Sequence, residues 1–253
     1  QKEKLKAQEE AFEMLKENEK IVKEQNDILE IKVKERTRQL ELEKKKSDDL
    51  LLNILPQDIA EELKETGTTA ARLYSNVSVL FTDFVNFTTA SELMSPEELV
   101  SQIDYCFKGF DRIMDKYGIE KIKTIGDAYL AVCGLPSEDI HHAVKIVNAA
   151  KKVCDFMLAY ESMRSKENKP FFKIRIGINS GAVVAGIVGI KKYAYDIWGD
   201  TVNVAARMEQ NSMPGKINIS ESTHALVKDD FEFTYRGKID AKNKGLIDMY
   251  FLA

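Results

Sequence analysis

The first 49 residues carry a pattern of apolar and polar positions that is typical of one long helix. From Gln1 to Asp49 there is no proline or glycine, and Glu, Lys and Gln dominate, a composition that allows a helix or a disordered chain. Apolar residues recur with a period of about 3.5, which favours a helix whose apolar seam packs against a second copy in a parallel coiled coil. The seam has Leu5, Phe12, Asn26, Val33, Leu40 and Ile54 at a positions and Leu15, Val22, Leu29 and Leu50 at d positions.

Polar residues on this seam set its register and its strength. Asn26 at an a position favours an in-register pair, because a shifted register would leave its amide among leucines. Four other seam positions weaken the pairing: Glu19, Arg36, Glu43 and Ser47. A weak coiled coil suits an element that transmits a signal, since a switch needs two arrangements of similar energy. The alternative is a solitary charged helix in solvent.

The pattern changes after residue 49, which divides the chain into three predicted regions. Residues 1–49 form the long helix proposed to transmit a signal, 50–73 a joint and 74–253 a globular domain. In the joint, the segment LLLNILP ends the long helix, and Gln57 to Glu65 is predicted as a short amphipathic helix that stops at Gly67.

From about Tyr74 onward, short apolar strands alternate with helices. The order of elements is β-α-β-β-α-β, which predicts an α+β fold with a ferredoxin-like core and a sheet covered on one face by two helices. The predicted core elements are a strand at 77–83, a helix at 96–117, a hairpin of 121–125 with 129–132, a helix at 140–161, and a second hairpin of 172–179 with 183–188 across Ser180-Gly181. The C-terminal additions are a helix near 201–211 and short strands near 217, 231–235 and 249–252.

Composition narrows the function classes. With 253 residues, 44% of them hydrophobic, the chain can build one domain of ordinary size plus an appendage. A formal net charge of -4 gives no overall basic field, so no nucleic-acid partner is expected. The three cysteines are scattered, which predicts reduced thiols and neither a disulfide framework nor a zinc site.

No apolar run approaches 20 residues, so this portion is not expected to span a membrane. The reduced thiols predict that it is cytoplasmic. Because the chain opens with Gln1 and enters a charged helix at once, we expect a longer protein, with an upstream sensor or a membrane anchor in the same chain.

Two aspartates are candidate metal ligands. Asp83 follows the apolar strand SVLFT, and Asp127 occupies the turn of the next hairpin, so both carboxylates can project from adjacent strand ends towards one point. Mg²⁺ and Mn²⁺ favour such oxygen ligands and take the rest from water and phosphates. Taken singly, Asp83 could cap a helix and Asp127 could be an ordinary turn residue.

Four segments resemble the class III adenylate and guanylate cyclases, in the order and spacing of that family. The resemblance covers about Tyr74 to the C-terminus. The segments are FTDFVNFT (81–88), IEKIKTIGDAYLAVCG (119–134), RIGINSGAVVAGIVG (175–189) and YDIWGDTVNVAARM (195–208).

The resemblance implies an active site at a dimer interface, with the metal aspartates on one subunit and the remaining residues on the other. It assigns two Mg²⁺ or Mn²⁺ ions per site to Asp83 and Asp127, with the backbone carbonyl of Phe84 as a further ligand. This fits the chemistry, in which the ribose 3′-hydroxyl attacks the α-phosphate in line and pyrophosphate leaves.

Lys123 and Asp196 match the adenine-reading pair of that family. A lysine can donate to adenine N1 and an aspartate can accept from the exocyclic amine, whereas guanine presents the opposite pattern. Guanylate cyclases typically carry a glutamate and a cysteine at these two positions. The resemblance therefore implies an adenylate cyclase, which converts ATP to cyclic AMP. Without the motif, Lys123 would be interpreted as a solvated lysine, as neighbouring Lys121 is.

Asn203 and Arg207 lie four positions apart, so a helix would place them on one face. By resemblance, Asn203 contacts the ribose and Arg207 meets the charge that develops on the α-phosphoryl group. Lys242 matches a lysine that contacts the terminal phosphates, with Lys244 as a rival. Lys191 stands where many relatives have an arginine for the same purpose.

Because every chain carries all of these residues, a symmetric head-to-tail homodimer would hold two complete sites. The alternatives are a guanylate cyclase and a catalytically silent dimeric signalling module.

Two other groups of residues receive structural interpretations. Tyr193, Tyr195 and Trp198 are expected to serve packing, and the histidines His141, His142 and His224 are expected on helix surfaces.

Overall fold

The computed structural model describes residues 2–189, 193–241 and 245–253. It divides into two compact units, residues 1–60 and 61–253, and each is described by itself.

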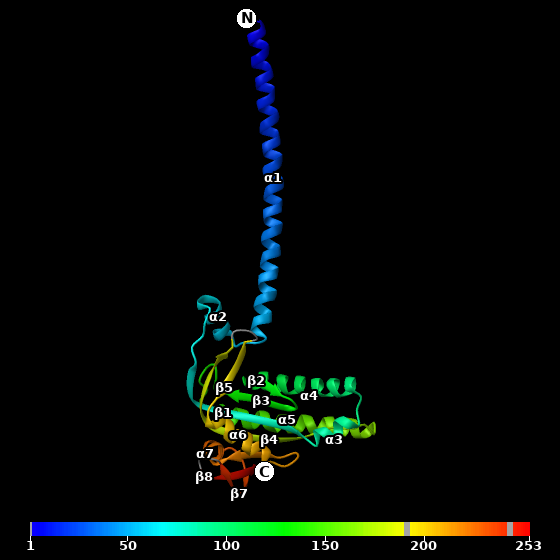
Figure 1. Ribbon diagram of the computed structural model, residues 1–253, viewed down its shortest axis with the longest axis vertical. Helices are drawn as coiled ribbons and strands as arrows, with labels where there is room; N and C mark the ends of the chain where they lie inside the picture. The colour runs from blue at the N-terminus through cyan, green and yellow to red at the C-terminus, as the bar shows by residue number, and fades with distance from the viewer. Residues whose placement is uncertain (1, 190–192, 242–244) are drawn as a thin grey trace. The chain divides into compact units, whose positions relative to one another are not determined.

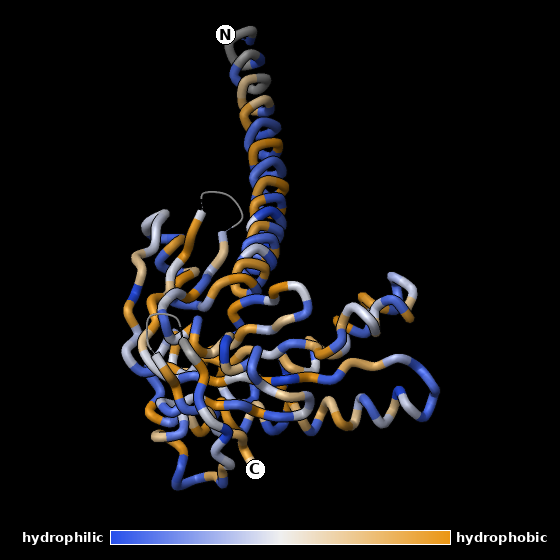
Figure 2. Tube along the Cα trace, turned by 60° about the horizontal axis from the view of Figure 1, so that its bottom comes forward, coloured by the Kyte–Doolittle hydropathy of each residue, from blue (hydrophilic) through white to orange (hydrophobic). Residues whose placement is uncertain are grey.

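The first unit is dominated by helix α1, Lys2–Leu52, which runs 51 residues without a break (Figure 1). The predicted long helix is therefore confirmed. Apolar residues recur along it (Figure 2). Their side chains are largely exposed: Leu15 is 61% exposed, Val22 54% and Leu29 57%. Helix α2, Gln57–Thr66, follows Pro56 and ends before Gly67, whose φ of 74° suits a glycine. The predicted short helix is confirmed as well.

The second unit is built on a mixed sheet. Its described strands number eight and run in the order β2-β3-β1-β4-β6-β8-β7, with β5 paired to β4. The strands are β1 Arg72–Val85, β2 Glu120–Ile125, β3 Ala128–Cys133, β4 Lys173–Val188, β5 Ala194–Trp198, β6 Ile217–Ser220, β7 Phe233–Ala241 and β8 Gly245–Leu252. The helices are α3 Phe87–Glu92, α4 Pro96–Tyr117, α5 His142–Lys166, α6 Asp200–Gln210 and α7 Glu221–Val227.

Helix α4 shows how local sequence sets the boundaries of an element. The Ser95 hydroxyl accepts a hydrogen bond from the Glu98 backbone N–H at 3.2 Å, and Pro96 takes the first helical position. Gly118, with a φ of 64°, ends the helix in the left-handed conformation. The bounds agree with those predicted.

Helices cover both faces of the sheet. Apolar residues of β1, β3 and β4 pack against α4 and α5 in one core that includes Leu80, Phe110, Ile146, Ile176 and Ile178. The predicted β-α-β-β-α-β core with two helices on one face is confirmed. Alternate residues of a strand face opposite sides, and on the other face β4 meets α6.

The contact between β4 and α6 is made by backbone. A Cβ added at Gly177 would lie 1.9 Å from the Glu209 nitrogen and 2.5 Å from its Cα. Only glycine leaves room for α6 to lie this close to the sheet.

The predicted second hairpin is wrong. Strand β4 continues through Ser180-Gly181 and pairs with β1 from Arg72↔Ala185 to Val85↔Lys173. The Ser180 hydroxyl lies 2.6 Å from that of Ser78 inside the sheet, and a Cβ at Gly181 would lie 2.7 Å from Thr201 Oγ1. These two residues, typical of turns, serve a buried polar contact and a close approach here.

His142 also differs from the prediction. Its side chain is buried, and Nδ1 lies 2.7 Å from the Ser78 hydroxyl, which continues through Ser180 to Thr223. Burial lowers the pKa of His142, partly offset by the charge of Asp139. His142 therefore belongs to an internal hydrogen-bonded chain rather than to the helix surface.

Candidate active site

The two predicted metal ligands are brought together. Asp83 lies near the end of β1 and Asp127 in the turn between β2 and β3, and pairing of β1 with β3 up to Thr82↔Tyr129 places the two ends side by side. Burial and the adjacent Asp83 carboxylate raise the pKa of Asp127, while Arg175 opposes the increase. The two carboxylates are close enough to repel each other, so the location favours a cation.

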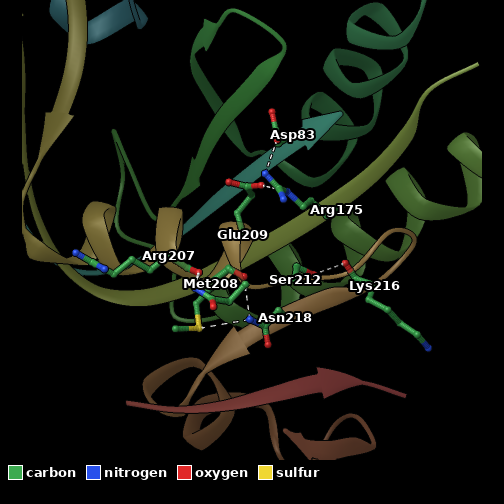
Figure 3. Close-up of polar contacts among 9 residues, drawn as sticks. Asp83, Arg175, Arg207, Met208, Glu209, Ser212, Lys216 and Asn218 are labelled. Atoms are coloured by element: carbon green, nitrogen blue, oxygen red, sulfur yellow. Dashed lines mark hydrogen bonds and ion pairs between the residues drawn. The ribbon is translucent and has the colours of Figure 1, made fainter. Parts of the chain in front are cut away.

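Arg175 supplies a positive charge at this location. It sits directly across from Asp83 in the β1–β4 ladder, and its Nη2 donates to Asp83 Oδ2 at 2.7 Å. Its Nε donates to Oε1 of Glu209 on α6, so the guanidinium lies between two carboxylates (Figure 3). Burial lowers the pKa of Arg175, but Glu209 and Asp83 raise it to a larger extent.

Glu209 is the most enclosed carboxylate of the group, with a side chain that is only 8% exposed. Burial raises its pKa, and the nearby Asp83 and Asp127 charges act in the same direction, whereas Arg175 lowers it. Because an unpaired carboxylate is costly in such surroundings, the ion pair with Arg175 stabilises the packing of α6 on the sheet.

The donor set fits a divalent cation of the Mg²⁺ type. Among the described residues, no group of three or more His, Cys, Asp or Glu side chains is placed to hold a metal ion, and Asp83 and Asp127 form a pair. One or two carboxylates are the usual protein contribution to Mg²⁺ sites that also bind phosphates. Phe84 lies two positions past the last β1–β3 pair, and its side chain is buried in the core, so only its backbone can serve the site.

Lys123 and Asp196 form an ion pair, although they come from strands β2 and β5. The Asp196 side chain is 15% exposed and that of Lys123 41%. Asp196 Oδ1 also accepts from the backbone N–H of Ile197 at 2.9 Å. The carboxylate is thereby fixed in place, while the lysine side chain remains partly exposed.

Asn203 and Arg207 lie one turn apart on α6, with Asn203 exposed and Arg207 half-buried. The Arg207 side chain extends away from Asp83 and Glu209 (Figure 3). Helix α6 therefore presents Glu209 to the metal-ligand candidates of its own chain and Arg207 in another direction. The predicted phosphate contacts Lys191 and Lys242, with the rival Lys244, lie outside the described residues.

Arg175 and Glu209 were missed as site residues. The signal for Arg175 was a charged residue between Ile174 and Ile176, which are both buried. Because side chains alternate along a strand, Arg175 faces the side of the sheet opposite to Ile174 and Ile176. A charged side chain on a central strand needs a partner on that side.

The predicted packing residues Tyr193, Tyr195 and Trp198 differ in burial: Tyr195 is buried, while Tyr193 is 43% exposed and Trp198 39%.

In the described part of the chain, no helix has the length and apolar character required to cross a membrane.

Known proteins similar to this chain include cyclases of both substrate types. The receptor-type guanylate cyclase gcy-5 of Caenorhabditis elegans is 38% identical over 237 residues, 92% of this chain and 21% of that protein. An adenylate cyclase of Mycobacterium tuberculosis (strain ATCC 25618 / H37Rv) is 37% identical over 214 residues, 84% of this chain and 47% of that protein. The chain thus spans about a fifth of the first relative and about half of the second.

Solved structures give the same picture. The catalytic core of a rhodopsin-guanylyl cyclase with converted specificity, in complex with ATPalphaS, matches with a TM-score of 0.67 and 35% identity, covering 73% of this chain and 98% of that one. The adenylyl cyclase CyaB from P. aeruginosa matches with a TM-score of 0.69 and 28% identity, covering 73% and 96%. Residues 69–253 match the family model described as the adenylate and guanylate cyclase catalytic domain, and the chain therefore belongs to this class III cyclase family.

Proposed function

We propose that this chain is the catalytic part of an adenylate cyclase, which converts ATP to 3′,5′-cyclic AMP and pyrophosphate. The observation that carries the proposal is the ion pair of Lys123 with Asp196. A lysine donor and an aspartate acceptor are complementary to adenine N1 and its exocyclic amine. Guanine presents the opposite pattern of donors and acceptors, so neither Lys123 nor Asp196 would find a hydrogen-bond partner on it. A site with such unpaired polar groups discriminates strongly against the wrong base.

A guanylate cyclase is the second candidate. Overall similarity does not separate the two, because the guanylate and adenylate cyclase relatives are 38% and 37% identical. The side chains at positions 123 and 196 favour ATP, because a guanine reader would need an acceptor at the first position.

The cations that the site would bind are two Mg²⁺ or Mn²⁺ ions, held by Asp83, Asp127 and the backbone carbonyl of Phe84. When bound, they supply activation of the ribose 3′-hydroxyl and neutralisation of the phosphate charges. Asp83 and Asp127 would hold the positive charge of these cations beside the α-phosphate. Asn203 orients the ribose, and Arg207 donates to the α-phosphoryl oxygens as negative charge develops there. Lys191 and Lys242 are proposed to bind the terminal phosphates.

The site is proposed to form between two copies of the chain. Supporting this, Arg207 extends away from Asp83 within one chain (Figure 3), so the two residues meet most simply when Arg207 comes from a partner. A symmetric head-to-tail homodimer then contains two complete sites. A symmetric pair of α1 helices would join the same two chains through their exposed apolar seam.

Residues 1–49 are proposed as a signalling coiled coil, 50–73 as a joint and 74–253 as the cyclase domain. The coiled coil would set the separation or rotation of the two cyclase domains and so control closure of the shared sites. Its input would come from an upstream sensor or a membrane domain in the full-length chain, with the present portion in the cytoplasm.

The test is product formation by the purified protein with ATP and GTP side by side in Mn²⁺, comparing the parent with Asp83→Ala. Cyclic AMP from the parent alone supports the reaction, the base preference and the metal site together. An excess of cyclic GMP over cyclic AMP would replace the proposal by that of a guanylate cyclase. No product from either nucleotide would favour the silent signalling module.

A further inference from the structure

Arg175 and Glu209 form a pair that touches the metal-ligand candidate Asp83 from one side. One edge of the guanidinium is divided between two carboxylates, with Nε on Glu209 and Nη2 on Asp83 Oδ2 at 2.7 Å. The Arg175 side chain is 28% exposed, that of Asp83 21% and that of Glu209 8%. Asp83 is thus held by Arg175 through Oδ2, and its carboxylate also lies beside that of Asp127.

We infer that Arg175, fixed by Glu209, is a positioning residue that orients the Asp83 carboxylate for the divalent cation. This inference rests on the proposed metal role of Asp83. Ligating carboxylates are commonly held by hydrogen bonds from a second layer of residues, and loss of such a residue weakens metal binding. Arg175 has the geometry for this task, because it lies directly across from Asp83 on the neighbouring strand.

Glu209 explains how an arginine can occupy this place. A cation beside a divalent ion would repel it, but the Arg175–Glu209 pair is neutral as a unit, so the repulsion is largely cancelled. Glu209 also fixes the plane of the guanidinium, and its backbone is locked against Gly177 of β4, where a Cβ would lie 1.9 Å from the Glu209 nitrogen. The orientation of Asp83 is therefore set by a rigid contact between helix and sheet.

Charge and orientation give different expectations for Mn²⁺ binding, which makes the inference testable. In Arg175→Lys the charge stays, but a single ammonium cannot span both carboxylates as the planar fork does. In the double variant Arg175→Gln/Glu209→Gln one positive and one negative charge are lost together. If only net charge mattered, both variants would bind Mn²⁺ like the parent; if orientation matters, both bind it more weakly.

The matched control is the Arg164–Glu98 pair between α5 and α4. The Arg164 side chain is buried and donates to Glu98 at 2.8 Å, and like that of Arg175 it shares its guanidinium with a second acceptor, here the Pro170 carbonyl at 2.8 Å. Arg164→Gln/Glu98→Gln removes a comparable ion pair, with one buried and one partly exposed partner, that lies outside the site. It reports the effect of lost stability alone.

The experiment is titration of the whole chain with Mn²⁺ alone, following free Mn²⁺ by electron paramagnetic resonance, with circular dichroism to confirm folding. We expect the Kd for Mn²⁺ to rise about tenfold in both site variants and to stay at the parental value in the control. Values within about twofold of the parent for both folded variants would overturn the positioning role. An equal loss in the control would also overturn it, since stability would then be the cause.

Asp83→Asn separates this inference from the proposed function. Saturable Mn²⁺ binding by the parent that Asp83→Asn abolishes supports the assigned site, and parental binding by the two Arg175 variants would then overturn only the positioning role. Binding that survives Asp83→Asn would overturn the metal site itself and the inference with it.

Discussion

Lys123 on β2 and Asp196 on β5 lie 73 positions apart in the sequence, and their side chains form an ion pair. Strand β2 pairs with β3, and β5 pairs with β4, so this contact joins the two strands through side chains. The pair presents one donor group and one acceptor group, which is the minimum that distinguishes adenine from guanine.

Exchange of this pair is expected to change the base preference. In Lys123→Glu/Asp196→Cys, the first position becomes an acceptor and the second loses its charge, which is the pattern typical of guanylate cyclases. We expect the ratio of kcat/KM for ATP over GTP to fall by about a hundredfold or more, measured by separate assays of cyclic AMP and cyclic GMP.

Lys121→Gln is the matched control for this exchange. Lys121 lies on the same strand and forms an ion pair with Asp111 at 2.9 Å. Its loss should leave the base preference at the parental value. A double variant that still prefers ATP as strongly as the parent would contradict the assignment of base recognition to Lys123 and Asp196.

Mixing two inactive variants tests whether the site is shared between chains. Asp83→Ala and Arg207→Ala homodimers should each be inactive, because every site lacks one essential residue. A refolded equal mixture should recover about a quarter of the parental activity, since half of the dimers then hold one intact site of two. Activity that stays at the level of the single variants would indicate that Asp83 and Arg207 serve the same site from one chain.

The exposed apolar seam of α1 predicts self-association that depends on particular positions. Leu29 and Ile31 are both exposed, by 57% and 66%, but only Leu29 falls on the predicted seam. Leu29→Lys should raise the dissociation constant of the dimer at least about tenfold, because the charge would be buried between two helices. Analytical ultracentrifugation of the full chain measures this.

Ile31→Lys is the control for the helix prediction, because it introduces the same side chain two positions away. It should sediment like the parent. Equal weakening by the two variants, or none by either, would argue against the proposed register and favour a solitary helix.

Buried His142 predicts a loss of stability in mild acid. Burial lowers its pKa in the folded protein, so the unfolded chain binds the proton more readily. The contribution of neutral His142 to the free energy of unfolding is present above the unfolded-state pKa of about 6.5. It is lost as the pH falls through that value towards the folded-state pKa, by at most about 1.4 kcal/mol per pH unit. Urea unfolding followed by near-ultraviolet circular dichroism at pH 7.5 and 5.5 measures the difference.

His142→Gln should flatten this dependence, since glutamine can bond to Ser78 without titrating. His141→Gln, at the exposed neighbouring position, should follow the parental curve. If the parent and His142→Gln lose the same free energy of unfolding between the two pH values, another group is responsible.

Much of the core was predictable because its signals are local. Pro96 and Gly118 mark the ends of α4, and period-2 or period-3.6 patterns identify β1 and α5. The approach of Asp83 to Asp127 also followed from the order of strand ends, and the pairing of β1 with β3 confirms it.

The errors arose where a tertiary contact overrides a local signal. Ser180-Gly181 is typical of a turn, but Ser180 bonds to Ser78 across the sheet and Gly181 accommodates Thr201. His142 lies next to a second histidine at the start of a helix, and its buried partner Ser78 is 64 positions away. The ion pair of Arg175 with Glu209 joins residues 34 positions apart. A local sequence pattern does not indicate which charged residues of two separate elements will form such a pair.

The absence of a side chain at Gly177 has a mechanical consequence. With no clearance between β4 and the backbone of Glu209, α6 cannot slide along the sheet without breaking the contact, so Asn203 and Arg207 travel with the strand that carries Arg175. Any movement that displaces β4 should therefore carry α6 with it, so that Arg175, Asn203 and Arg207 shift together rather than relative to one another.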